Sequence, residues 1–161
     1  MFKDMPKKTI YEFAFQAVPC VGFNTRRVTR LVTQYYDKAL APAEIRSTQF
    51  SLLNSLSMLG EISMKDLASI LAMDRTTLTR DLKPLLNRGL VSVTIGKDRR
   101  VHPIEITSKG RKVLELAQPY WEKAQAKIVE SLGSDTWEKI MRYLHQISMI
   151  VEDDFSNPDI K

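Results

Sequence analysis

The stretch "MDRTTLTRDLKPLLNRGLV", residues 73–91, carries leucines along one side of a helix and threonines with basic residues along the other. The leucines follow helical spacing and are expected to face a protein core. They are Leu78, Leu82, Leu85 and Leu86. A solvated helix face usually mixes acidic and basic side chains, whereas this one has little acid. The pattern indicates a helix whose polar side meets a negatively charged partner.

The positive charge of the chain is concentrated around that helix. The 161 residues have a formal net charge of +5, with ten Lys or Arg and four Asp or Glu between residues 74 and 112. The rest of the chain holds 14 basic and 15 acidic residues and is nearly neutral. An excess confined to one segment is typical of a surface that binds nucleic-acid phosphates.

The order of predicted elements defines the fold class. Helical periodicity and capping residues predict helices over residues 23–40, over 48–59, after Ser63, from Arg75 onward with Asp74 as the N-cap, over 108–132 with a kink or break near Pro119, and after Ser134. Between residues 90 and 107 the period changes to that of a hairpin. We therefore expect a mainly α fold with a small β-hairpin wing, a winged helix-turn-helix flanked by N- and C-terminal helices.

The helix that begins at Arg75 is expected to enter a DNA major groove. Arginine can pair bidentately with guanine there, and threonine can contact a thymine methyl group. Arg80 is the first candidate for a base contact, and Lys83 is expected on the phosphate backbone. The candidate DNA-contacting residues on this helix are Arg75, Thr76, Thr77, Thr79, Arg80 and Lys83.

The tip of the predicted hairpin, "GKDRR", repeats the basic pattern. Lys97, Arg99 and Arg100 stand beside a single acid, Asp98. A thin basic tip fits a minor groove, where narrow A·T-rich tracts attract arginine. Asp98 would be repelled by DNA, so it is expected to pair with an arginine and hold the shape of the tip.

Six short motifs along the chain are "TQFSLL" (48–53), "DLASIL" (66–71), "DRTTLTR" (74–80), "NRGLV" (87–91), "DRR" (98–100) and "ITSKG" (106–110). Together they resemble the multiple-antibiotic-resistance regulator (MarR) family. The resemblance runs from about Cys20 to the C-terminus. It implies a single domain over 1–161, with a winged helix-turn-helix over 45–107 and dimerisation helices within 1–40 and 108–155.

The resemblance also implies how such a dimer would meet DNA. Each subunit would place its fourth helix in the major groove, and its wing in the flanking minor groove, of a pseudo-palindromic double-stranded operator. The family positions correspond to Thr76, Thr77, Thr79 and Arg80, with Arg100 as the wing arginine braced by Asp98. Two features depart from the family pattern: no glycine precedes Asp74 in the turn, and Pro103 interrupts the returning strand.

Family resemblance favours a repressor released by a small aromatic or phenolic ligand. Aromatic residues on the predicted helices could line such a ligand cleft, and aromatics at helical spacing also serve as core or dimer contacts. They are Phe23, Tyr35, Tyr36, Phe50, Tyr120 and Trp121.

Cys20 offers a second mode of control. It lies at the start of the first predicted helix with Arg26 and Arg27 downstream, a setting that can favour the thiolate. Its position resembles that of the sensing cysteine in organic-peroxide-responsive family members. A lone cysteine is also commonly a small buried hydrophobe, and only the partner subunit's Cys20 or a small thiol could resolve a sulfenic acid.

Other function classes find little support in the sequence. His102 and His145 are far apart in the expected fold, and we find no phosphate loop, carboxylate pair or metal-spaced cluster, so we predict no enzyme, no metal and no cofactor. One cysteine and no membrane-length apolar run favour a cytoplasmic protein without membrane attachment. A winged helix for protein or RNA contact is the remaining alternative, although the helix lacks aromatics for stacking on RNA bases.

Overall fold

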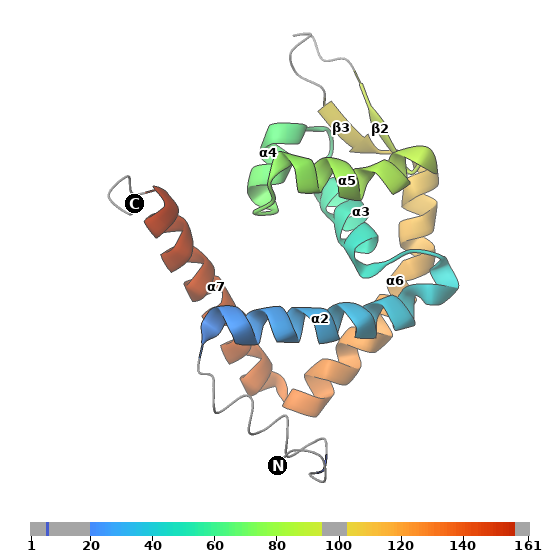
Figure 1. Cartoon of the computed structure of the whole chain (residues 1–161). Helices are drawn as coiled ribbons and strands as arrows, with labels where there is room; N and C mark the ends of the chain where they lie inside the picture. The colour runs from blue at the N-terminus through green and yellow to red at the C-terminus, as the bar shows by residue number, and fades with distance from the viewer. Residues whose placement is uncertain (1–5, 7–19, 95–102, 157–161) are drawn as a thin grey trace. The chain divides into compact units, whose positions relative to one another are not determined.

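The computed structural model describes residue 6 and residues 20–94 and 103–156, with side chains as far as residue 153. The chain divides into two compact units, residues 1–120 and 121–161. Figure 1 shows the helices and the small sheet in chain order. The elements are α2 (Val21–Leu40), η1 (Ala41–Ala43), α3 (Ser47–Leu59), β1 (Ile62–Ser63), α4 (Met64–Ile70), α5 (Arg75–Asn87), β2 (Val91–Val93), β3 (Pro103–Ile106), α6 (Ser108–Leu132) and α7 (Ser134–Ser156). The predicted fold class is confirmed.

The core of the first unit is built from leucines of α3, α4 and α5. Leu78, Leu82 and Leu85 of α5 are at most 1% exposed, as their spacing predicts. The same prediction was wrong for Leu86, which is 39% exposed. Consecutive residues of an α-helix point about 100° apart, so Leu86 cannot share the inward direction of Leu85.

The sheet has three antiparallel strands in the order β1-β3-β2. The β2–β3 hairpin is the predicted wing base, whereas β1 was not predicted because two residues give no readable alternation. The described part of the returning strand begins at Pro103, the first residue of β3, and residues 101 and 102 lie outside the described residues, so the interruption expected there stays a prediction. The first position of a strand tolerates proline because no ladder donor is needed there. The Pro103 carbonyl accepts a hydrogen bond from the Thr94 amide at 2.9 Å.

The turn between α4 and α5 is closed without glycine. Ala72 takes its place with a left-handed backbone, φ +49°. The Ala72 amide donates to the Ser69 carbonyl (3.1 Å), and the Met73 amide donates to the Ala68 carbonyl (2.9 Å). These bonds satisfy the last carbonyls of α4 and hold a conformation that L-residues rarely adopt.

The start of α6 is tied directly to the residues that lead into β2. The Thr107 hydroxyl donates to the Gly89 carbonyl at 2.8 Å and accepts a bond from the Gly110 amide at 3.0 Å. At Gly110 a Cβ atom would lie 2.1 Å from the Leu90 carbonyl oxygen. The "ITSKG" motif therefore combines a helix cap with a position where the backbones are too close for any side chain.

The second unit holds the end of α6 and all of α7. Helix α6 continues through Pro119 without a break, so the predicted break is not found. Gly133 separates the two helices with φ +76°. Helix α7 exposes a set of large apolar side chains: Met141, Tyr143, Leu144, Met149, Ile150 and Val151.

Candidate nucleic-acid interface

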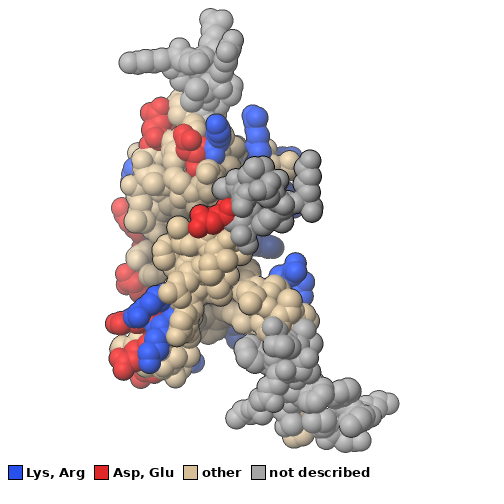
Figure 2. Space-filling model, turned by 90° about the vertical axis from the view of Figure 1, so that its left-hand side faces the viewer, with Lys and Arg blue, Asp and Glu red and all other residues tan. Residues whose placement is uncertain are grey.

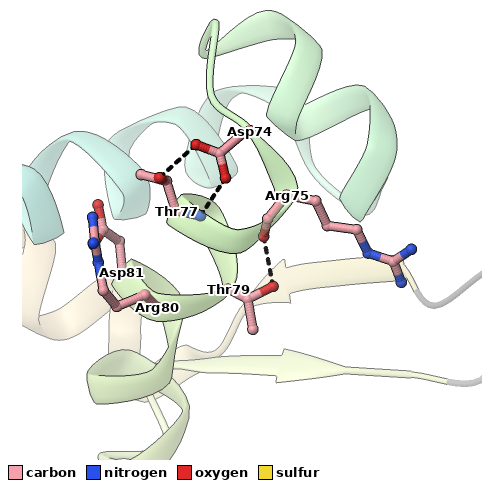
Figure 3. A network of polar contacts seen from close by, with 6 residues as sticks. All are labelled: Asp74, Arg75, Thr77, Thr79, Arg80 and Asp81. Carbon is pink, nitrogen blue, oxygen red and sulfur yellow. Dashed lines mark hydrogen bonds and ion pairs between the residues drawn. The ribbon is translucent and has the colours of Figure 1, made fainter.

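Helix α5 is capped at its N-terminus by Asp74, as predicted. The carboxylate accepts one bond from the Thr77 amide (2.8 Å) and one from the Thr77 hydroxyl (2.6 Å), drawn in Figure 3. These hydrogen bonds favour the charged carboxylate and hold the pKa of Asp74 below its ordinary value. The cap therefore orients the first turn of α5 and places an acid at its positive end.

This cap predicts a pH dependence of stability. Because the folded-state pKa of Asp74 is lowered, its contribution is present above the unfolded pKa of about 4 and is lost as pH falls through the folded-state value. We expect Asp74→Ala to lower the thermal midpoint at pH 7 and to have a smaller effect at pH 2.5. Asp74→Asn keeps a good cap and is the control. Equal effects of Asp74→Ala at both pH values would contradict this role.

The side of α5 opposite the buried leucines is exposed and predominantly basic. We call it the outward face; it comprises Thr76, Thr79, Arg80 and Lys83, all exposed, whereas the exposed Arg75 lies at the start of the helix in register with Leu78 and Leu82. The Thr79 hydroxyl donates to the Arg75 carbonyl at 2.8 Å, so that hydroxyl proton is used within the helix. Of the residues predicted on this helix, Thr77 differs, because it is half-buried and its hydroxyl donates to Asp74.

Arg80 has an acidic neighbour that the sequence analysis did not select. Its Nε lies 3.3 Å from Oδ1 of Asp81, whose side chain is 24% exposed against 73% for Arg80. Figure 3 shows the guanidinium alongside this carboxylate. An acid directly after an arginine on an otherwise basic helix is the sequence feature that could have indicated Asp81.

The predicted wing contacts cannot be placed in the same way. Lys97, Asp98, Arg99 and Arg100 lie outside the described residues. The base of the wing is described, with Val91 paired to Ile106 and Val93 to Ile104. Figure 2 shows Lys and Arg side chains on the upper part of one face, with Asp and Glu side chains beside them. This face of the molecule therefore carries both positive and negative side chains.

Comparisons with known proteins identify the family. A family model described as the MarR family matches residues 45–102. A crystal structure of the M. tuberculosis transcriptional regulator MosR in complex with DNA is 38% identical, covers 83% of this chain and 97% of that one, and has a TM-score of 0.77. A second MosR crystal structure is 36% identical, covers 83% and 96%, and has a TM-score of 0.73. The chain belongs to the MarR family.

A curated relative covers a shorter stretch. An uncharacterized HTH-type transcriptional regulator of Bacillus subtilis, YwoH, is 30% identical over 86 residues. These make up 53% of this chain and 63% of YwoH, so the match spans less than two thirds of that relative. As a MarR-family winged-helix transcriptional regulator, the protein is not an enzyme, as the sequence predicts.

Cys20 of this MarR-family chain directly precedes α2 and is exposed, with no disulfide. Its carbonyl accepts bonds from the backbone amide and the side-chain amide of Asn24, at 3.0 and 3.1 Å. The Arg26 guanidinium donates through Nε to the Gly22 carbonyl at 3.1 Å. The predicted sensor is therefore accessible in the single chain, with a cation one turn or two along the helix.

The aromatic residues predicted for a ligand cleft have different environments. Tyr35 and Tyr36 of α2 meet edge to face with ring centroids 5.6 Å apart. Burial, with a smaller contribution from Tyr35, raises the pKa of Tyr36. Phe50 is 4% exposed in the core, whereas Phe23 is exposed. Tyr120 and Trp121 belong to different compact units.

The described residues also form a hollow that the sequence did not indicate. An open pocket of about 620 Å³ lies where α2, η1, α3 and the end of α5 meet. Its lining residues are Asp37, Ala41, Glu44, Ile45, Arg46, Gln49 and Arg88. Arg88 donates to the Glu44 carbonyl at 2.7 Å, and Asp37 accepts bonds from the amide and hydroxyl of Ser47, both at 2.7 Å. These bonds tie α2 and α5 to the start of α3.

The described part of the chain contains no group of three His, Cys, Asp or Glu side chains placed to hold a metal ion. Within the same residues, no helix combines the length and apolar character that crossing a membrane requires.

Proposed function

We propose that this MarR-family protein is a dimeric, sequence-specific DNA-binding regulator that acts in the cytoplasm, and that it represses transcription by occupying an operator. The observation that carries the proposal is the outward face of α5, exposed and basic on the side opposite Leu78, Leu82 and Leu85. The MosR structure determined with DNA supports this assignment, at 38% identity over most of both chains.

The chemistry of the outward face matches a major groove. Arg80 offers terminal guanidinium donors that can pair with O6 and N7 of guanine. Thr79 donates its hydroxyl to the Arg75 carbonyl, which leaves its methyl group to contact a thymine methyl. Lys83 lies farther along the helix and is assigned to a phosphate, a contact that fixes register without reading sequence.

Dimerisation is inferred from apolar surface that a single chain leaves exposed. Helix α2 exposes Val28 and Leu31, and α7 exposes Leu144 and Ile150, the last by 63%. Clusters of exposed large apolar side chains mark protein–protein contacts. We assign the segments 1–40 and 108–155 to a two-fold dimer interface, which would set two copies of the 45–107 head on two half-sites.

Direct binding measurements test this function against its alternative. Fluorescence anisotropy with labelled genomic duplexes and with single-stranded RNA of equal length distinguishes the partners. We expect the duplex to be preferred, with affinity falling steeply as salt rises from 50 to 200 mM, because several phosphate contacts release counterions. Tighter binding to RNA, or duplex affinity independent of salt, would favour a winged helix for RNA or protein contact.

The wing gives a separate prediction. We assign Arg100 to the minor groove, Lys97 and Arg99 to its phosphates, and Asp98 to bracing the tip. Arg100→Ala is expected to weaken binding by roughly tenfold on operators with A·T-rich flanks and by less on G·C-rich flanks. Lys97→Ala is the control and should weaken both alike. An unchanged flank preference in Arg100→Ala would remove the minor-groove assignment.

Release from DNA is proposed to follow binding of a small aromatic or phenolic ligand, with oxidation of Cys20 as the alternative. Cys20→Ser separates the two. If oxidation controls release, hydrogen peroxide should dissociate wild-type protein from a labelled operator, and Cys20→Ser should stay bound. If an aromatic ligand controls release, salicylate-like phenols should dissociate both proteins equally. Peroxide release of both proteins would exclude sensing through Cys20.

A further inference from the structure

We propose that Asp81 is a positioning residue for Arg80, one that lowers general DNA affinity while sharpening base discrimination. This inference rests on the proposed function, because it concerns how α5 reads a base. It starts from the 3.3 Å contact between Nε of Arg80 and Oδ1 of Asp81. This role accounts for Asp81, whose negative charge would otherwise only weaken the binding of α5 to DNA.

The contact uses only one end of the guanidinium. Arginine carries five N–H donors in a planar fork, one on Nε and four on the two terminal nitrogens. Asp81 lies against Nε, which leaves the terminal nitrogens as the edge that can pair with guanine O6 and N7. Figure 3 shows the guanidinium held alongside the Asp81 carboxylate, away from the side chain of Arg75.

The two side chains differ in how far they are exposed. Asp81 is 24% exposed and Arg80 is 73% exposed, so the acceptor is the better covered partner of the contact. A restrained arginine loses less rotational freedom when it meets a base, so more of its pairing energy is available for recognition. The bond therefore prepares Arg80 for one geometry before DNA arrives.

The negative charge of Asp81 weakens DNA binding, and the ion pair with Arg80 adds little to the stability of the folded protein. Exposed ion pairs contribute little to protein stability. Residues one position apart on a helix do not face each other, so this pair is no strong brace for α5. A carboxylate near DNA phosphates weakens binding to every sequence. The other acid of this helix end, Asp74, is engaged in capping through Thr77. Asp81 thus acts on Arg80 rather than on the helix.

Two substitutions separate the hydrogen bond from the charge. Asp81→Asn keeps an oxygen acceptor and removes the negative charge, whereas Asp81→Ala removes both. The exposed Glu61 provides the charge-matched control Glu61→Gln, outside α5. Affinities are measured by anisotropy on an operator selected from genomic DNA, on a random duplex, and on the operator carrying 7-deazaguanine, which lacks the N7 acceptor. Far-UV circular dichroism confirms that each variant is folded.

We expect Asp81→Asn to bind operator and random duplex more tightly by a similar factor, roughly threefold to tenfold at 50 mM salt. Its preference for the operator should stay within about twofold of wild type. Asp81→Ala should gain the same general affinity and lose roughly tenfold in preference for the operator. Asp81→Ala should also lose most of the wild-type loss of affinity on the operator that carries 7-deazaguanine. Added to Arg80→Ala, it should not change the preference for operator over random duplex any further.

Three results would overturn the inference. An operator preference in Asp81→Ala equal to that of wild type would show that Arg80 needs no positioning. An equal loss of preference in Asp81→Asn and Asp81→Ala would assign the effect to charge. A similar loss in Glu61→Gln would make it a general effect of charge on the surface. If the proposed function itself is wrong, the result is different: the wild-type protein would bind every tested duplex with the same affinity as random DNA.

Discussion

Arg80→Ala is expected to lose most of the sequence discrimination of the protein while it still binds DNA. Arg80 is the outward-face residue with the strongest means of reading a base, and one bidentate arginine–guanine pair is worth about 1–3 kcal/mol. The ratio of operator to random-duplex affinity should therefore fall about 10- to 100-fold. Affinity for random duplex should fall far less, because the remaining cations still meet phosphates. Competitive anisotropy measures both quantities.

Lys83→Ala is the matched control for that experiment, since it removes a cation from the same exposed face of α5. A phosphate contact carries no sequence information, so its loss should weaken all duplexes by a similar factor and reduce the salt dependence by about one ion. The groove assignment is contradicted if Arg80→Ala behaves as Lys83→Ala does, or if it retains the wild-type preference for the operator.

Gly110→Ala is expected to destabilise the winged helix strongly. The added Cβ would lie 2.1 Å from the Leu90 carbonyl oxygen and 2.8 Å from Cγ1 of Ile106. The first neighbour is backbone and cannot rotate away, so α6 has to move away from Leu90, the residue before β2. Overpacking of this kind costs about 1–3 kcal/mol, which corresponds to a thermal midpoint lowered by about 2–12 °C. Differential scanning calorimetry gives the midpoint.

Gly22→Ala is the control for Gly110→Ala. Its Cβ would meet the flexible end of Arg26, 3.3 Å away, and the Cys20 sulfur at 4.0 Å, and the residue lies in the first turn of α2. Alanine is favoured over glycine in a helix, so this change should raise stability by up to about 1 kcal/mol. If Gly110→Ala were as well tolerated as Gly22→Ala, the close approach of α6 to the sheet would be wrong.

The sequence was sufficient for much of the fold because its main features are local. The leucine spacing of α5 predicted three buried residues, and Asp74 was recognised as a cap from its place before the periodic run. Both depend only on helical geometry and on backbone donors near the aspartate. The motifs likewise predicted the family; within the described residues, "DRTTLTR" and "ITSKG" each combine a helix cap with a buried core residue.

Other features depend on tertiary structure and could not be predicted in this way. Strand β1 consists of two residues that pair with β3, some 40 positions away in the chain. The left-handed backbone at Ala72 is imposed by the short turn between α4 and α5 and leaves no sign in the residue type. The contact of Asp81 with Arg80 depends on side-chain rotamers, which the spacing of a helix does not specify.

Selection of genomic fragments shows whether two copies of α5 read two related half-sites. Purified protein in reducing buffer at moderate salt is mixed with fragments of the source genome, and the bound DNA is sequenced. We expect enrichment of a two-fold symmetric site whose half-sites lie about one helical turn apart, 10–10.5 base pairs. Recovery of fragments with no shared sequence would mean that the basic face serves another partner and that α5 does not read DNA.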